Sequence, residues 1–129
     1  MSADDILVFA GSGSPKLTRA ICAYLNIEPA LGEVLRFSEG NLFVRVKENV
    51  RGRRTYVVQS TVYPTNDNFM ELLFWIDALK RASAESVTVI MPYFSLGWGP
   101  SLYPGNLKIP LAFSAMTARS SSGVMSAAA

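Results

Sequence analysis

The stretch from residue 56 to residue 91 constrains the fold of this chain more than any other. It contains two runs of strand-forming residues, 56–59 and 87–91, separated by a long segment with helical periodicity. A strand, a helix and a strand in this order imply a right-handed crossover and a parallel sheet. The sequence therefore predicts an α/β fold, and its 129 residues are enough for one domain but too few for two ordinary ones.

The helix predicted between these strands covers residues 68–82. Asn66 or Asp67 is expected to cap its amino end, and Glu71 to lie in the first turn, where a negative charge complements the helix dipole. Its apolar residues recur at helical spacing and are expected to form the buried face: Phe69, Leu72, Leu73, Ile76 and Leu79. The aromatic residues of this segment are expected in the core or at a subunit interface: Phe69, Phe74 and Trp75.

The first twenty-five residues predict a strand, a turn and a helix. Ile6–Ala10 is a continuous apolar run, as in a strand buried on both faces, and residues 11–14 then supply Gly and Ser. Ser14 and Pro15 suit the cap and first position of a helix over about 15–25, on which Cys22 is expected to be buried. The turn could offer N–H groups to a phosphate, but it lacks both the dinucleotide fingerprint and the phosphate-loop lysine. A plain turn is the favoured interpretation.

Residues 34–46 predict a β-hairpin, because two strand-like runs flank the turn-forming residues 38–41. The turn carries Glu39 and Asn41, which can orient a sugar hydroxyl or a nucleobase edge, although such residues are more often part of an ordinary solvated turn. The connection that follows has a cluster of guanidinium groups suited to phosphate or to a solvated loop, and both interpretations stay open: Arg51, Arg53 and Arg54.

Composition narrows the class of protein. A net charge of +2, with 17% charged residues, does not provide the dense basic field typical of nucleic-acid binding. The single cysteine and the acidic first residues are typical of a cytoplasmic protein without an intramolecular disulfide or a signal peptide. No apolar run approaches the ~20 residues of a membrane-spanning helix. Histidine is absent, so any catalysis must use other groups.

The character of the chain changes after Phe94. All ten acidic residues lie in residues 1–94, and the segment 95–129 is rich in Ser, Ala, Gly and Pro without a sustained period of two or 3.6 residues. We therefore expect one domain over 1–94 and a divergent, irregular tail over 95–129.

Several short motifs together give a specific resemblance. They are FAG at 9–11, RFSEGN at 36–41, ENVRG at 48–52, QST at 59–61, PTNDNFMEL at 64–72, DALKRASA at 77–84 and PYF at 92–94. In this order and spacing, residues 6–94 resemble the start of ribose-phosphate diphosphokinases, also called phosphoribosyl pyrophosphate synthetases.

The resemblance implies a fold and an activity. The fold is a phosphoribosyltransferase-like, mostly parallel sheet flanked by helices. The family transfers the diphosphoryl group of Mg-ATP to ribose 5-phosphate, giving phosphoribosyl pyrophosphate and AMP for nucleotide biosynthesis. ATP, ribose 5-phosphate and Mg²⁺ are thus the implied substrates and cofactor. The implied protein partners are further copies of the chain, in a homo-oligomer, or full-length synthetase subunits; neither nucleic acid nor a membrane is expected.

The resemblance also implies an ATP-contacting loop. Phe37, Glu39 and Asn41 match the family loop that contacts ATP bound to a neighbouring subunit, with Phe37 stacking on adenine and the polar residues hydrogen-bonding it. The usual family loop reads Phe-Ser-Asp-Gly-Glu, so Glu39 and Asn41 are departures from the pattern, and the nucleotide preference is left open.

A second implied site binds a regulatory phosphate or ADP between subunits. Asn49, Arg51 and Ser83 match its positions, and Arg51 is the best match of the three. The resemblance stops at Phe94, before the family's magnesium-binding histidine, catalytic flap and ribose-phosphate loop, so no catalytic residue and no metal ligand is predicted here.

Three hypotheses follow from these observations. The chain is an enzyme subunit by descent that is inactive when isolated, or a non-catalytic nucleotide-binding, regulatory or oligomerisation module of the same family. The third hypothesis is a gene remnant that does not fold stably, because a truncated sheet exposes an apolar edge.

Overall fold

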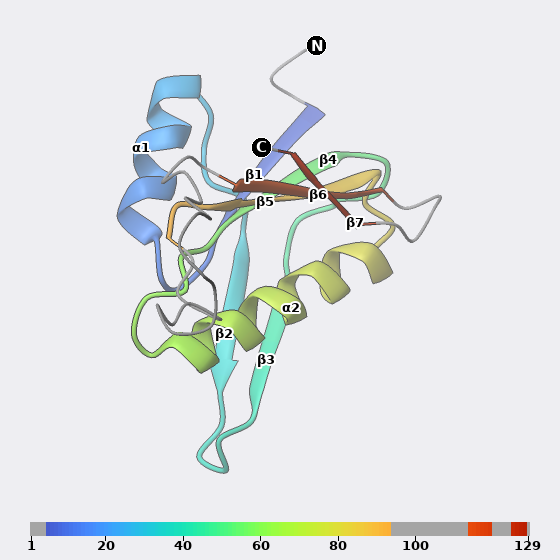
Figure 1. The fold of residues 1–129 in the computed structure, drawn as a ribbon. Helices are drawn as coiled ribbons and strands as arrows, with labels where there is room; N and C mark the ends of the chain where they lie inside the picture. The colour runs from blue at the N-terminus through green and yellow to red at the C-terminus, as the bar shows by residue number, and fades with distance from the viewer. Residues whose placement is uncertain (1–4, 94–113, 120–124, 129) are drawn as a thin grey trace.

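Two helices and seven strands make up the described part of the chain, which in this computed structural model covers residues 5–93, 114–119 and 125–128 (Figure 1). In chain order they are β1 (Ile6–Ala10), α1 (Pro15–Leu25), β2 (Gly32–Arg36), β3 (Leu42–Val46), β4 (Arg54–Val58), α2 (Thr65–Arg81), β5 (Ser86–Met91), β6 (Ser114–Arg119) and β7 (Met125–Ala128).

The larger sheet has the strand order β1-β4-β5-β6-β7. Its first three strands are parallel, so that Phe9 lies beside Val57 and Val57 beside Val89. The chain passes from β4 through α2 to β5, which is the crossover that the sequence predicted. The predicted α/β class and the parallel sheet are confirmed.

The last two strands correct one expectation about the tail. Residues 95–129 were expected to be irregular, but β6 pairs antiparallel with β5, and β7 pairs antiparallel with β6. Backbone pairing at the free edge of β5 satisfies N–H and C=O groups without requiring a periodic side-chain pattern, which is why the composition gave no sign of it. The domain boundary at residue 94 stays a prediction.

The two helices cover opposite faces of the sheet. Leu7 and Phe9 of β1 point toward α2 and join the main core, whereas Val8, between them, packs with Cys22 of α1. This alternation follows from the period of two along a strand. The strand at 6–10, the helix at 15–25 and the burial of Cys22 are all confirmed.

Helix α2 begins at Thr65, three residues before the predicted start, and Pro64 is its N-cap residue, without a side-chain capping bond. The N-cap predicted at Asn66 or Asp67 is therefore wrong, and polar side chains near the start of α2 are used in tertiary contacts instead. Asp67 pairs with Arg36, and the side chain of buried Asn68 donates a hydrogen bond to the carbonyl of Val62 at 2.8 Å. Propensity for capping is thus outweighed by contacts with other segments.

The buried face of α2 is also rotated from the predicted one. Its members are Asn68, Glu71, Leu72, Trp75, Ile76 and Leu79. Trp75 lies in the core, with its ring centroid 5.3 Å from that of Phe9. Leu73 and Phe74 are 39% and 37% exposed, so the expected burial of Leu73 is wrong. Of the two placements expected for Phe74, the core is excluded and a subunit interface stays a prediction. The polar residues Asn68 and Glu71 lie on the buried face because each has hydrogen-bond partners there.

The smaller sheet is the hairpin β2-β3, predicted for residues 34–46 and observed from Gly32 onward. Its strands are antiparallel, and Val44 joins the core beside α2. Gly32 is required because a Cβ atom there would lie 2.5 Å from the ring of Trp75. Figure 1 shows the hairpin passing α2, with its turn projecting beyond the helix.

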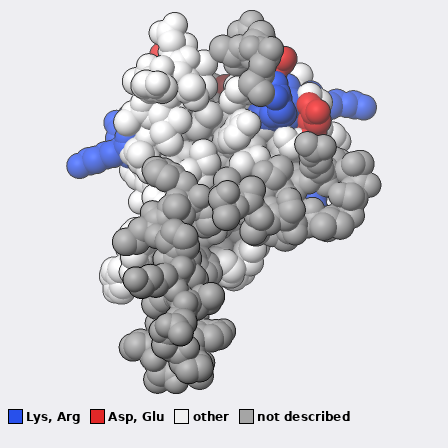
Figure 2. Space-filling model, turned by 45° about the horizontal axis from the view of Figure 1, so that its top comes forward, with Lys and Arg blue, Asp and Glu red and all other residues white. Residues whose placement is uncertain are grey.

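The face drawn in Figure 2 shows no large field of one charge among its described residues. In the face drawn in Figure 2, basic side chains stand at separate places on a largely neutral described surface, and some lie near acidic ones. Among the described helices, none is long and apolar enough to cross a membrane.

Candidate functional site

The hairpin turn holds the predicted adenine-contacting residue in an exposed position. The N–H of Phe37 donates to the carbonyl of Asn41, and the N–H of Gly40 donates to the carbonyl of Phe37, both at 2.9 Å. Gly40 has φ +86°, a conformation that side chains disfavour. The Phe37 side chain is 53% exposed. A closed turn thus presents an aromatic ring that can stack on a nucleobase.

Glu39 and Asn41 belong to the same turn and are both exposed. Their carboxylate and amide groups lie next to Phe37 in the chain, where they can donate to and accept from a ligand that stacks on the ring. The three residues that the sequence assigned to ATP are therefore on one loop at the far end of the hairpin.

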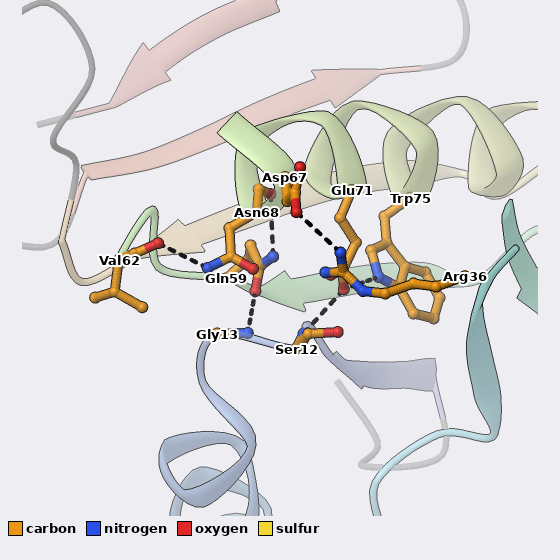
Figure 3. A network of polar contacts seen from close by, with 9 residues as sticks. All are labelled: Ser12, Gly13, Arg36, Gln59, Val62, Asp67, Asn68, Glu71 and Trp75. Carbon is orange, nitrogen blue, oxygen red and sulfur yellow. Dashed lines mark hydrogen bonds and ion pairs between the residues drawn. The ribbon is translucent and has the colours of Figure 1, made fainter. Parts of the chain in front are cut away.

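The base of this loop is tied to α2 by Arg36 (Figure 3). One guanidinium nitrogen lies 3.1 Å from the carboxylate of Asp67, and the other lies 4.0 Å from Oε2 of Glu71. Glu71 was expected in the first turn of the helix as a dipole-complementing charge, which is wrong. It is fully buried, and its Oε1 accepts from the N–H of Ser12 at 2.9 Å and from the indole N–H of Trp75 at 3.2 Å.

The turn at residues 11–14 uses its backbone N–H groups within the chain. The N–H groups of residues 11, 12, 13 and 14 donate, in that order, to the Val58 carbonyl, Glu71 Oε1, Gln59 Oε1 and the Gly11 carbonyl. A phosphate would have to displace these bonds, so the plain-turn interpretation is favoured over a phosphate site.

The second candidate site brings together residues that lie more than thirty positions apart in the chain. The segment after β3 meets the end of α2, where Arg51 forms a bridge with Ala84 and the N–H of Gly52 donates to the Ser83 carbonyl at 3.0 Å. The side chain of Asn49 accepts from the N–H of Arg51 at 3.3 Å. Asn49, Arg51 and Ser83 therefore lie close together.

Arg51 is the exposed member of the predicted guanidinium cluster. Arg53 and Arg54 are partly buried, and Arg54 is the first residue of β4. Val50, directly before Arg51, is 1% exposed and belongs to the core. Because the Val50 side chain is buried, the backbone next to Arg51 is held in place, and the exposed guanidinium of Arg51 can bind an anion.

Two titratable groups are perturbed in the described residues. The Lys47 ammonium, 2.7 Å from Glu33, donates a hydrogen bond that lowers the pKa of that carboxyl, and Arg45 adds to the effect. Burial raises the pKa of the Cys22 thiol, and the charge of Glu28 raises it further. Glu33 lies on β2 and Cys22 on α1, so neither group lies on the hairpin loop.

A metal centre is not formed by the described residues, in which no three His, Cys, Asp or Glu side chains gather to hold an ion.

The polar contacts beneath the loops were not predicted. Gln59 bridges two segments, accepting from the N–H of Gly13 and donating to the Asn68 carbonyl at 3.0 Å, and the Ser14 hydroxyl donates to that of Ser60 at 2.9 Å. Their position in the sequence was the signal that could have predicted these contacts. Gln59 and Ser60 directly follow the buried parallel strand β4, and residues at this point lie near the loops at the same edge of the sheet.

Comparison with known proteins identifies what these features resemble. The family described as the N-terminal domain of ribose phosphate pyrophosphokinase matches residues 6–97. Ribose-phosphate pyrophosphokinase from Ralstonia nicotianae is 49% identical over 94 residues, and that from Nitrosomonas europaea is 51% identical over 94 residues. Each match covers 73% of this chain and 30% of the relative.

A solved structure supports the same fold. The crystal structure of phosphoribosylpyrophosphate synthetase from Mycobacterium smegmatis matches with a TM-score of 0.67 and 38% sequence identity. The match covers 70% of this chain and 30% of that one. The chain thus spans less than a third of the length of the relatives it matches.

Proposed function

The chain belongs to the family of the N-terminal domain of ribose phosphate pyrophosphokinase, and on that basis we propose that it supplies part of the ATP site of such an enzyme. The part is the hairpin loop with Phe37, Glu39 and Asn41, which contacts ATP held by a neighbouring subunit. Phe37 stacks on the adenine, and the two polar residues hydrogen-bond its edge.

The observation that carries the proposal is the position of Phe37. A large aromatic ring is 53% exposed at the end of a hairpin whose other end is packed in the core, although exposure of an aromatic ring opposes the hydrophobic effect. The loop projects beyond α2 (Figure 1), so another subunit can approach it. Such a residue is suited to complete a site on a partner.

The reaction proposed for the assembled enzyme transfers the diphosphoryl group of ATP to the 1-hydroxyl of ribose 5-phosphate. The bond between the α and β phosphates breaks, and AMP leaves. Mg²⁺ bound to ATP neutralises the phosphate charge in such reactions. The role of this chain is confined to binding and orienting the base, which converts binding energy into correct placement of the phosphates.

A second role is proposed for the cluster of Asn49, Arg51 and Ser83, as a site for a regulatory phosphate or ADP. The exposed guanidinium can form a bidentate contact with a phosphate group. The support for this role is the bridge that holds residues 51 and 84 side by side. This observation also favours the alternative function, a non-catalytic regulatory or oligomerisation module of the same family.

The test mixes this chain with a full-length synthetase relative whose corresponding loop aromatic has been replaced by Ala. Size-exclusion chromatography shows whether the two proteins co-elute, and AMP release from ATP and ribose 5-phosphate reports activity. We expect no release by the chain alone, co-elution of the mixture, and recovery of activity on mixing. Turnover by the chain alone, or the absence of co-elution, would contradict the proposal. A changed response to phosphate or ADP without recovered activity would favour the regulatory module.

A further inference from the structure

The two oxygens of the buried Glu71 carboxylate have different partners. Oε1 accepts from the indole of Trp75, within α2, and from the backbone N–H of Ser12, which joins α2 to the turn after β1. Oε2 is buried and has no hydrogen bond within the described part of the chain. Its charged partner is the guanidinium of Arg36, 4.0 Å away (Figure 3).

A buried carboxylate is costly unless a positive charge or hydrogen bonds compensate it. Neutral Gln at this position would accept the same two hydrogen bonds through its amide oxygen, so packing alone does not explain the charge. The structure offers a different reason, because Arg36 is the residue directly before Phe37 and the last residue of β2.

We infer that Glu71 is a positioning residue, which holds Arg36 and thereby fixes the orientation of the loop that carries Phe37. The inference deepens the proposed function and rests on it for its effect on nucleotide. The exposed carboxylate of Asp67 assists at 3.1 Å, but its side chain is 55% exposed and its attraction is weakened by water. Arg36 is 47% exposed and Glu71 is at 0% exposure, so the buried carboxylate, whose Oε2 has no hydrogen bond among the described residues, relies on this guanidinium for compensation of its charge.

The connection reaches beyond the hairpin. Since Oε1 of the same carboxylate holds the N–H of Ser12, the loop of the nucleotide site and the turn after β1 share one buried group. A change in either segment that displaces Glu71 is therefore expected to alter the position of Phe37.

The test compares Glu71→Gln with the parent chain by amide hydrogen exchange. The substitution keeps an acceptor for Ser12 and Trp75 and places an NH₂ group against the guanidinium, where two donors face each other. We expect the Phe37 amide, bonded to the Asn41 carbonyl, to exchange about tenfold faster. The Lys47 amide, bonded to the Leu31 carbonyl at the opposite end of the hairpin, is expected to stay unchanged.

Two variants separate positioning from a general structural effect. Asp67→Asn removes the exposed partner alone and is expected to change Phe37 exchange less than Glu71→Gln does. In an Arg36→Gln background, Glu71→Gln is expected to add no further acceleration, because the partner through which it acts is gone. If Glu71→Gln does not fold, Arg36→Gln alone must accelerate Phe37 exchange while leaving Lys47 unchanged.

The inference is overturned by an unprotected Phe37 amide in the parent chain, by an unchanged Phe37 rate in Glu71→Gln, or by equal acceleration at Phe37 and Lys47. It is also overturned if Asp67→Asn accelerates Phe37 exchange as much as Glu71→Gln does, if Glu71→Gln adds further acceleration in the Arg36→Gln background, or if Arg36→Gln alone leaves the Phe37 rate unchanged. Nucleotide binding is measured separately, with ATP and the full-length partner. If exchange changes as expected but ATP affinity of the assembly does not, the positioning role holds and the proposed contact between Phe37 and ATP fails.

Discussion

The N–H of Gly13 donates a hydrogen bond of 2.9 Å to Oε1 of Gln59, which joins the turn after β1 to the end of β4. Gln59 is completely buried, and it also donates to the carbonyl of Asn68 at the start of α2. One amide group therefore connects three segments of the chain. Glycine is needed in the turn because this side chain passes so close to it.

Replacing Gly11 with Ala is expected to destabilise the fold. A Cβ atom there would lie 2.2 Å from Oε1 of Gln59 and 2.6 Å from its Cδ, so the bridge would have to move. We expect the free energy of unfolding to fall by about 1–3 kcal/mol, as for overpacked interiors. Urea denaturation measures the change. Ser12→Ala is the control, since its exposed side chain can be shortened while its N–H still reaches Glu71; equal stabilities of the two variants would contradict the account.

Replacing Phe37 with Ala is expected to weaken ATP binding by the assembled enzyme without lowering stability. Loss of one stacked aromatic removes ~1–3 kcal/mol of binding free energy, which lowers the affinity by roughly 5- to 150-fold. Phe43→Ala is the matched control, because Phe43 lies on the same hairpin, is 48% exposed and contacts Arg45 instead of the loop. Isothermal titration calorimetry with a non-hydrolysable ATP analogue measures affinity. Equal losses in both variants would argue against a specific contact at Phe37.

Replacing Arg51 with Ala is expected to weaken phosphate or ADP binding by roughly 10- to 150-fold, because a hydrogen bond to a charged group contributes ~1.5–3 kcal/mol. Arg81→Ala is the control, since Arg81 is 80% exposed on α2 and pairs with Asp77. Titration of the co-assembled chain with inorganic phosphate measures the difference. Unaltered phosphate affinity in Arg51→Ala would exclude the proposed role of this guanidinium.

The ion pair between Glu33 and Lys47 is expected to give stability that depends on pH. Because the pKa of Glu33 is lowered in the folded chain, the contribution is fully present above the ordinary value of 4.5 and is lost as pH falls through the lowered pKa. Glu33→Gln lacks this contribution at every pH. Urea unfolding at a series of pH values should therefore show a difference between parent and variant that shrinks in acid, and high salt should reduce it. A difference independent of pH would refute the assignment to Glu33.

Local patterns in the sequence were sufficient for the elements that carry periodic apolar residues. The run of Ile6–Ala10, the Ser14-Pro15 pair and the hairpin turn around Gly40 all predicted structure that is present. The crossover through α2 followed from the order of these elements. Such features depend on neighbours in the chain, which a sequence displays directly.

The contacts between distant segments could not be predicted in the same way. Glu71 was assigned to the helix dipole, yet two of its partners, Ser12 and Arg36, come from other segments of the chain. The third, Trp75, lies one turn later on the same helix. The start of α2 was misplaced for a similar reason, since Asn68 bonds to Val62. A polar residue on a helix has no visible signal that distinguishes a cap from a buried bridge, because the distinction depends on the tertiary fold.

Photolabelling with 8-azido-ATP in the presence of a full-length synthetase relative tests most directly whether Phe37 contacts nucleotide held by a neighbouring subunit. The account predicts an adduct on this chain within residues 37–41, which appears only when the partner is present, is lost in Phe37→Ala and persists in Phe43→Ala. An assembly in which the label lies elsewhere on the chain, or in which both variants are labelled equally, would contradict it.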